Sequence, residues 1–199
     1  MIWWSKTRKT AAYLASMAVL GALLGPTKSI MLRVPTVGLI GDTLTSLCLV
    51  VGTLAGPALA AALAGTSRYE RTGIRPLLLL DWGLLVCGTA LCGLAEYLTQ
   101  GAAVTDSSGL RNAVISGALA LVIQRATFPA VVAGSIPAIL LLVSVTAGQR
   151  HGETAPWAVL ASDTTGLALH NYAAILVGAL ACAKVATQTG WMSRVGRPL

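Results

Sequence analysis

Few residues in this chain could do chemistry, and the one that stands out is an aspartate inside an apolar stretch. Asp81 follows four leucines and precedes Trp82 in the stretch Leu77–Leu98. A carboxylate within lipid is costly, and where one occurs it tends to bind a cation or a proton. The alternative is an aspartate near the membrane surface, in water or paired with Arg75, which lies about 9 Å away along a helix axis.

A second group of polar side chains is concentrated in one short internal turn. The turn contains Arg68, Tyr69, Glu70 and Arg71, and it ends at Pro76, a residue that suits the first turn of a helix. Charges of both signs in an exposed turn could dock a protein partner. The arginines could also do no more than hold this loop on the cytoplasmic side.

The remaining reactive residue types are not spaced for catalysis or for metal binding. The sequence has no Gly-x-x-x-x-Gly-Lys-Ser/Thr phosphate loop, no His-Glu-x-x-His pair and no Gly-x-Ser-x-Gly elbow. His151 lies in a loop and His170 begins an apolar stretch, so a haem between two membrane histidines is not expected. The cysteines all fall in apolar stretches, in no redox or metal spacing. We therefore expect no enzyme, no cofactor and no metal.

Six apolar stretches must position these polar residues. A membrane-spanning helix needs about 20 residues, and each stretch is interpreted as one such helix. The sequence therefore predicts an all-α fold, a polytopic membrane protein with about six transmembrane helices. Residues 1–199 form a single transmembrane domain in this interpretation, with a short interfacial lead-in at residues 1–10. The six stretches are Ala11–Gly25, Val37–Ala64, Leu77–Leu98, Leu110–Ile123, Phe128–Ala147 and Gly166–Val185.

Composition supports a membrane protein. Hydrophobic residues make up 55% of the chain and charged residues 11%, and the mean hydropathy is +0.76. A soluble domain has about 25% charged residues, because its surface faces water. The net charge of +7 is divided among short loops, where it suits anionic lipid headgroups better than nucleic acid.

The basic residues fall into two unequal groups when successive stretches cross a membrane in opposite directions. Short cytoplasmic loops retain Lys and Arg, so the larger group predicts that both the N-terminus and the C-terminus are cytoplasmic. The larger group is Lys6, Arg8, Lys9, Arg68, Arg71, Arg75, Arg125, Lys184, Arg194 and Arg197, and the smaller is Lys28, Arg33, Arg111 and Arg150.

Two of the stretches have unusual features. Leu110–Ile123 is short, so it either crosses fully or forms a re-entrant pair with the next stretch, and the charge distribution favours full crossing. Pro137 in the fifth stretch predicts a kink or break. Pairs of small residues four apart, at Gly21 and Gly25 and at Gly52 and Gly56, predict close helix packing, as does the pair Ala174 and Gly178.

The order of these features resembles that of a known family. A basic lead-in precedes the first stretch, and the alanine-rich end of the second, Ala60–Ala64, leads into the turn with Glu70. An external Ala155-Pro156-Trp157 sequence precedes the last stretch. This plan resembles the small ABC-2-type permeases, the membrane subunits of many bacterial ABC exporters, over nearly the whole chain.

The resemblance implies a mechanism and a set of partners. Two permease copies would pair, and a separate cytoplasmic ATPase subunit would dock on the cytoplasmic turns, here through Arg68, Tyr69, Glu70 and Arg71. ATP-driven closure of the ATPases would rock the helices and expel a hydrophobic or amphiphilic substrate. The resemblance also implies a location in the bacterial plasma membrane.

Two other classes of function also fit the sequence. A non-catalytic structural or assembly subunit of a larger membrane complex needs no ligand-type residues and would bind other membrane subunits. A proton- or cation-coupled carrier would use Asp81, although such carriers often contain internal repeats that this chain does not show.

Overall fold

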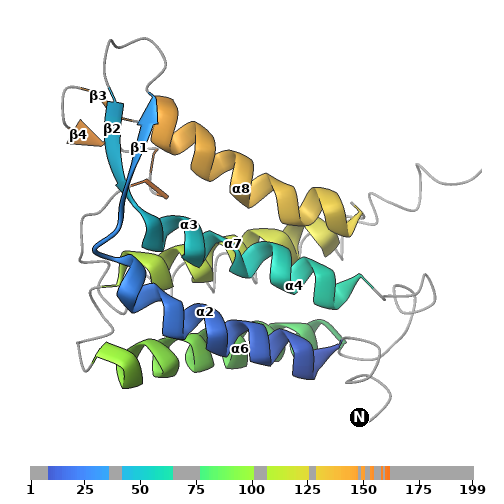
Figure 1. Ribbon diagram of the computed structural model, residues 1–199. Helices are drawn as coiled ribbons and strands as arrows, with labels where there is room; N and C mark the ends of the chain where they lie inside the picture. Colours follow the sequence, from blue (N-terminus) through green and yellow to red (C-terminus); the bar gives the residue numbers. More distant parts are fainter. Residues whose placement is uncertain are drawn as a thin grey trace, which may run out of the picture.

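The structure, a computed structural model, is a bundle of helices with two short antiparallel strand pairs (Figure 1). It describes residues 9–35, 42–64, 77–100, 107–125, 129–147, 149–150, 153–154, 158 and 160–161. The predicted all-α fold is thus corrected to a mostly helical one. The elements are α2 (Thr10–Thr27), β1 (Met31–Pro35), β2 (Asp42–Ser46), α3 (Leu47–Thr53), α4 (Ala55–Leu63), α6 (Leu77–Gln100), α7 (Ser108–Arg125), α8 (Ala130–Ala147), β3 (Gln149–Arg150) and β4 (Glu153–Thr154).

Successive helices run through the bundle in alternating directions (Figure 1). α2 packs along α6, while α3 and α4 follow each other end to end and pack against α7. Both strand pairs lie at one end of the bundle, which we call the hairpin end, and α6 also ends there. The chain enters α2 at the opposite end. This up-and-down order is the one that short connections between helices produce.

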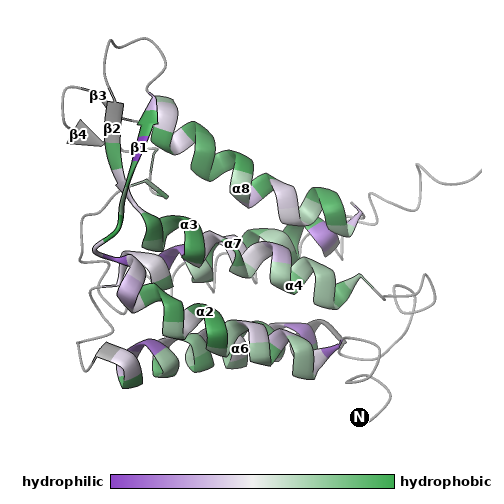
Figure 2. Cartoon of the chain, in the orientation of Figure 1, coloured by the Kyte–Doolittle hydropathy of each residue, from purple (hydrophilic) through white to green (hydrophobic). Residues whose placement is uncertain are grey.

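Three helices are long and apolar enough to cross a membrane, namely Thr10–Thr27, Leu80–Thr99 and Ala130–Ala147. Eighteen residues of helix extend about 27 Å, close to the roughly 30 Å of a hydrocarbon core. Hydrophobic residues cover much of these helices (Figure 2). The chain is therefore mostly helical with three candidate membrane-spanning helices, which indicates an integral membrane protein. The predicted sixth stretch, Gly166–Val185, lies outside the described residues.

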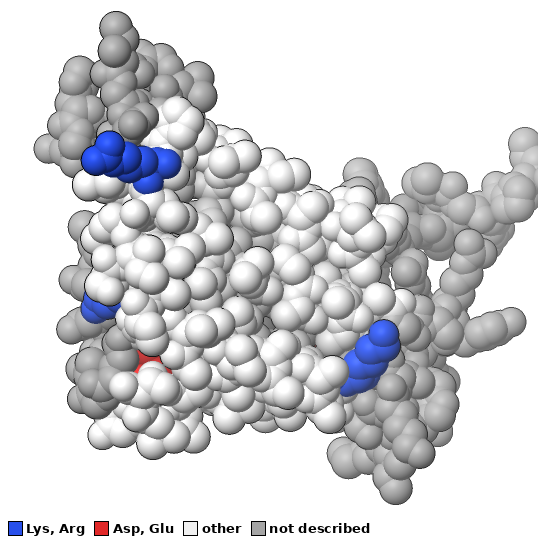
Figure 3. Space-filling model, in the orientation of Figure 1, with Lys and Arg blue, Asp and Glu red and all other residues white. Residues whose placement is uncertain are grey.

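Charged side chains avoid the middle of the visible surface. Figure 3 shows Lys and Arg only toward two opposite ends of the described part, with an uncharged surface between them. Lys28 and Arg33 follow α2 at the hairpin end, and Lys9 precedes α2 at the other end. A central uncharged zone between two charged ends is the surface that a bilayer requires.

The second predicted helix is wrong over Asp42–Ser46. The sequence predicts one helix over Val37–Ala64, whereas β2 occupies Asp42–Ser46 and α3 begins at Leu47. Thr43-Leu44-Thr45 alternates β-branched and apolar residues, a pattern that favours a strand. The strand pairs antiparallel with β1, and Arg33 lies opposite Leu44. All residues of β2 except Leu44 are polar, and the prediction of one long helix missed the strand because apolar residues follow it.

The rest of this stretch forms two helices that meet at Leu54. Pro57 has no N–H to donate to the carbonyl of Thr53, and its ring crowds that carbonyl. α3 accordingly ends at Thr53, and the helical pattern resumes where Ala58 N donates to Leu54 O at 3.1 Å. Pro137, by contrast, lies inside α8, which continues through it, so of the predicted kink or break only the break is wrong.

The fourth stretch forms one continuous helix of 18 residues, α7. It is not among the three helices that are long and apolar enough to cross a membrane. α7 contacts α3, α4, α6 and α8, and none of its described side chains is exposed. Because protein surrounds α7, its lower hydropathy is compatible with a position inside a membrane bundle.

The predicted close helix packing is confirmed at two glycines. A Cβ on Gly21 would overlap the backbone carbonyl of Cys92, and a Cβ on Gly52 would overlap that of Gly109. Only glycine therefore lets α2 approach α6, and α3 approach α7, this closely. The third pair, at Ala174, lies outside the described residues.

Candidate functional site

Buried polar side chains gather along α7 toward the hairpin end. Arg111 is 3% exposed, and Asn112 and Ser116 are fully buried. Charged and amide side chains in a membrane bundle are expensive, so they face the bundle interior and mark functional positions by default. We call this set, with the polar side chains that contact it, the α7 cluster.

Asn112 joins three parts of the chain through its amide. Its Nδ2 donates to the Leu160 carbonyl at 2.8 Å and to the Leu49 carbonyl at 3.3 Å. Its Oδ1 accepts from Nε and Nη2 of Arg111, both at 3.3 Å. The amide thus connects α7 with α3 and with the segment around Leu160, and it fixes one side of the Arg111 guanidinium.

Small polar side chains extend the α7 cluster toward the connection after α2. Cys48 Sγ lies 3.5 Å from Ser108 Oγ and 3.2 Å from Ser46 Oγ, and Ser46 Oγ donates to the Lys28 carbonyl at 3.0 Å. Ser107 Oγ accepts from Leu110 N at 3.0 Å and so caps the start of α7. These contacts tie the β1–β2 strand pair to the first turn of α7.

Glu96 also belongs to this end of the bundle. Its side chain is 7% exposed and hydrogen-bonds the side chain of Ser107. Its carboxylate interacts electrostatically with Lys28, which follows α2. The structure thus buries Glu96 beside the α7 cluster, although this residue is close to the end of α6.

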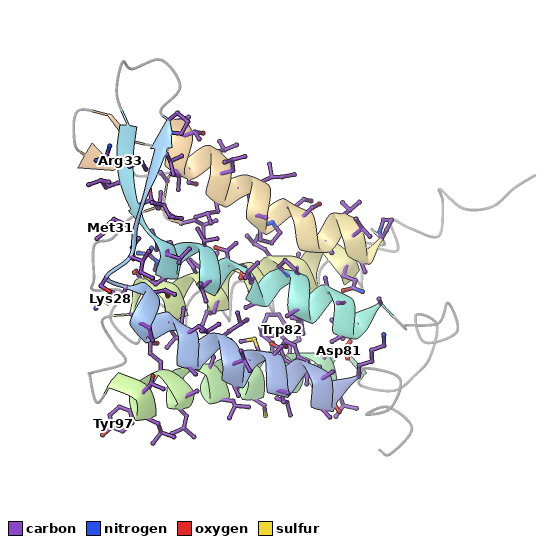
Figure 4. The ribbon with its side chains drawn as sticks, viewed as in Figure 1. Lys28, Met31, Arg33, Asp81, Trp82 and Tyr97 are labelled. Atoms are coloured by element: carbon purple, nitrogen blue, oxygen red, sulfur yellow. The ribbon has the colours of Figure 1, made fainter. Side chains whose placement is uncertain are left out.

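Asp81, the residue that the sequence favours for chemistry, lies elsewhere. Figure 4 shows it toward the end opposite the hairpins. It is fully buried, so an aspartate solvated at the membrane surface is wrong, and Arg75 lies outside the described residues. The neighbouring Trp82 is also buried, and among the described residues its indole N–H has no hydrogen-bond acceptor. The structure therefore does not bring Asp81 together with the α7 cluster.

The predicted docking turn, Arg68, Tyr69, Glu70 and Arg71, lies outside the described residues, as do His151 and His170. Within the described part of the chain, no three His, Cys, Asp or Glu side chains are grouped so that they could hold a metal ion. The polar groups of the described residues therefore act through hydrogen bonds and buried charge.

An open apolar groove of about 480 Å³ lies between α2 and the junction of α3 with α4. Its lining is Ala15, Ser16, Val19, Leu20, Leu54 and Ala58. The only hydroxyl among these side chains, that of Ser16, donates to the Tyr13 carbonyl. The groove therefore offers contacts to an acyl chain or another apolar group and none to a polar one.

The α7 cluster has only a weak signal in the sequence. In the sequence interpretation, Arg111 is a cation of an external loop and Asn112 is the last residue of that loop. The usable signal is that both lie at the start of Leu110–Ile123, an apolar stretch too short to span a membrane alone. Helix extension back to Ser108 brings both residues into the bundle.

Comparison of the chain with protein-family models, with curated proteins and with solved structures finds no match. The function is therefore inferred from the residues and contacts described above.

Proposed function

We propose that this chain is the membrane-spanning permease subunit of an ATP-driven exporter of the ABC-2 type, energised by a separate ATPase chain. In this proposal six helices cross the bacterial plasma membrane, both termini are cytoplasmic, and two copies pair. The hairpin end then faces outward, and the turn with Glu70 faces the ATPase.

The observation that carries the proposal is the buried polar character of α7. A purely structural subunit needs no arginine and asparagine inside its bundle, whereas a transport path needs polar groups that can exchange partners as helices move. Asn112 holds α7 to α3 and to Leu160 at the hairpin end. In an exporter, breaking and remaking these bonds would open and close the external side of the path.

The apolar groove supports a hydrophobic or amphiphilic substrate. It opens beside α2, where an acyl chain could reach it from the surrounding lipid. ATP-driven movement of α2 against α3 and α4 would change the groove without requiring any polar group to enter lipid.

The partner is tested by reversing one charge. We expect Glu70→Lys to lower the co-purification of a soluble ATPase at least tenfold, because it replaces an acidic docking contact with a repelling one, a change of more than about 1.4 kcal/mol. The measurement is quantitative mass spectrometry of affinity-purified full-length protein. Arg33→Gln at the hairpin end is the matched control and should leave recovery unchanged. Equal recovery of the ATPase with Glu70→Lys would mean that the turn does not dock it and that its charges only set the membrane topology.

The orientation is tested with two cysteines at opposite ends. Lys9 and Ser29 are both exposed, and they lie at opposite ends of α2. In a background without native cysteines, Lys9→Cys should react with a membrane-impermeant maleimide only from the cytoplasmic side. Ser29→Cys should react only from the other side. Labelling of both from one side would contradict the crossing of α2.

A second candidate is a proton- or cation-coupled carrier, which the full burial of Asp81 favours. Dependence of transport on the ATPase distinguishes this carrier from the exporter. Reconstituted transport should stop when the ATPase is removed, whereas transport by the isolated chain down a proton gradient would identify the carrier. Co-purification with several membrane proteins and no ATPase would instead support an assembly subunit.

A further inference from the structure

The β1–β2 hairpin lies across the end of the helix bundle. Figure 1 shows it running from the end of α2 past α3 to the end of α8, transverse to the helices. α2 extends about 27 Å, nearly the thickness of the hydrocarbon core. An element that follows such a helix directly and lies transverse to it is at the depth of the lipid headgroups.

The two faces of this hairpin differ. Thr45 is buried and Val34 is half-buried against the core, so their shared face packs on the bundle. The opposite face carries Met31, Arg33 and Leu44, and Arg33 is directly opposite Leu44. Met31 is 52% exposed and Leu44 is 59% exposed. The same register places Pro35 and Asp42 at one end of this face and the buried Ser46 at the other. The exposed part between them is thus apolar with a cation in its centre.

Neighbouring residues extend this combination of apolar and cationic side chains along the hairpin end. Lys28 and Ile30 precede the strand, and both are exposed. Figure 4 shows Lys28, Met31 and Arg33 following one another along this end, with Tyr97 of α6 at the same end. Exposed tyrosine beside cations is the residue combination of the membrane–water interface. Asp42 is paired with Pro35, at the other end of the hairpin from Lys28.

We propose that the outer face of the β1–β2 hairpin, formed by Met31, Arg33 and Leu44 with Lys28 beside it, binds the headgroups of anionic phospholipids. The two cations would contact lipid phosphate, and the two apolar side chains would insert between headgroups. A few exposed side chains are far fewer than the 20 to 30 residues per side of a stable protein interface. Lipid, in contrast, already surrounds this depth of the bundle.

This proposal does not depend on transport, and reconstituted full-length protein tests it. A fluorophore on Leu44→Cys, in a background without native cysteines, reports what surrounds the outer face. Brominated phosphatidylglycerol should quench it more strongly than brominated phosphatidylcholine at equal mole fraction, and aqueous iodide should quench it weakly. Quenching by iodide alone would place the face in water, and protection from all three quenchers would mean that protein covers it. Either result would overturn the proposal.

The charge contribution is tested in the same vesicles. The double variant Lys28→Gln/Arg33→Gln should weaken the relative affinity for phosphatidylglycerol by up to roughly thirtyfold, the combined effect of two surface cations. Lys9→Gln removes an exposed cation from the opposite end of α2 and should leave this affinity unchanged. An unaltered preference in the double variant would refute the role of the two cations.

Discussion

Replacing Gly52 with alanine is expected to separate α3 from α7 and to destabilise the bundle by about 1–3 kcal/mol or more. The added Cβ would overlap the backbone carbonyl of Gly109, and a backbone atom cannot rotate away as a side chain can. One helix must therefore shift, and the contacts around Asn112 must shift with it. For a chain of this size, the melting temperature should fall by roughly 2–12 °C.

Thermal unfolding in detergent, followed by size-exclusion chromatography, measures this effect. Gly21→Ala should give a similar loss, because its Cβ would overlap the carbonyl of Cys92 on α6. Gly83→Ala is the matched control, since Gly83 is exposed and a Cβ there meets no atom within 4 Å. Alanine is also the better helix former, so this variant should be unchanged or slightly more stable. Equal stability of all three variants would contradict the helix packing described here.

Replacing Asn112 with alanine is expected to destabilise the hairpin end by about 3 kcal/mol. The change removes the donor to the Leu160 carbonyl and the oxygen that Arg111 contacts, both within the buried α7 cluster. A buried polar group that loses its partner costs about 1–3 kcal/mol, and a charged one costs more. Hydrogen exchange of the residues around Leu160 should accelerate before global unfolding, because their only described side-chain bond to α7 is lost.

Asn112→Asp separates the contribution of the amide N–H that donates to Leu160 from that of the oxygen that Arg111 contacts. It keeps an oxygen near the Arg111 guanidinium but has no amide N–H to donate to Leu160. Exchange around Leu160 should therefore still accelerate, while the melting temperature should fall less than it does with alanine. Ser135→Ala is the control, since its exposed hydroxyl donates only to the Val132 carbonyl within α8. If Asn112→Ala behaves like Ser135→Ala, the amide does not hold the hairpin end.

The sequence by itself determined the helices whose surroundings are apolar. α2, α6 and α8 coincide with predicted stretches to within about two residues, because lipid or core demands the same apolar composition along their whole length. The spacing of Gly21 and Gly52 also predicted close packing, since small residues permit it wherever two helices meet. Which helices meet at these glycines was not encoded in any local pattern.

Tertiary structure decided the strand in the second stretch and the environment of the charged residues. Thr43-Leu44-Thr45 forms β2 because β1 supplies its hydrogen bonds, and β1 lies just before the stretch Val37–Ala64 that was interpreted as one helix. From its neighbours in sequence Arg111 looks like a loop charge, whereas Asp81 fits either an intramembrane position or one at the membrane surface. Both are buried because α7 and α6 are packed among other helices. Burial depends on the assembled bundle, so the sequence of one segment does not predict it.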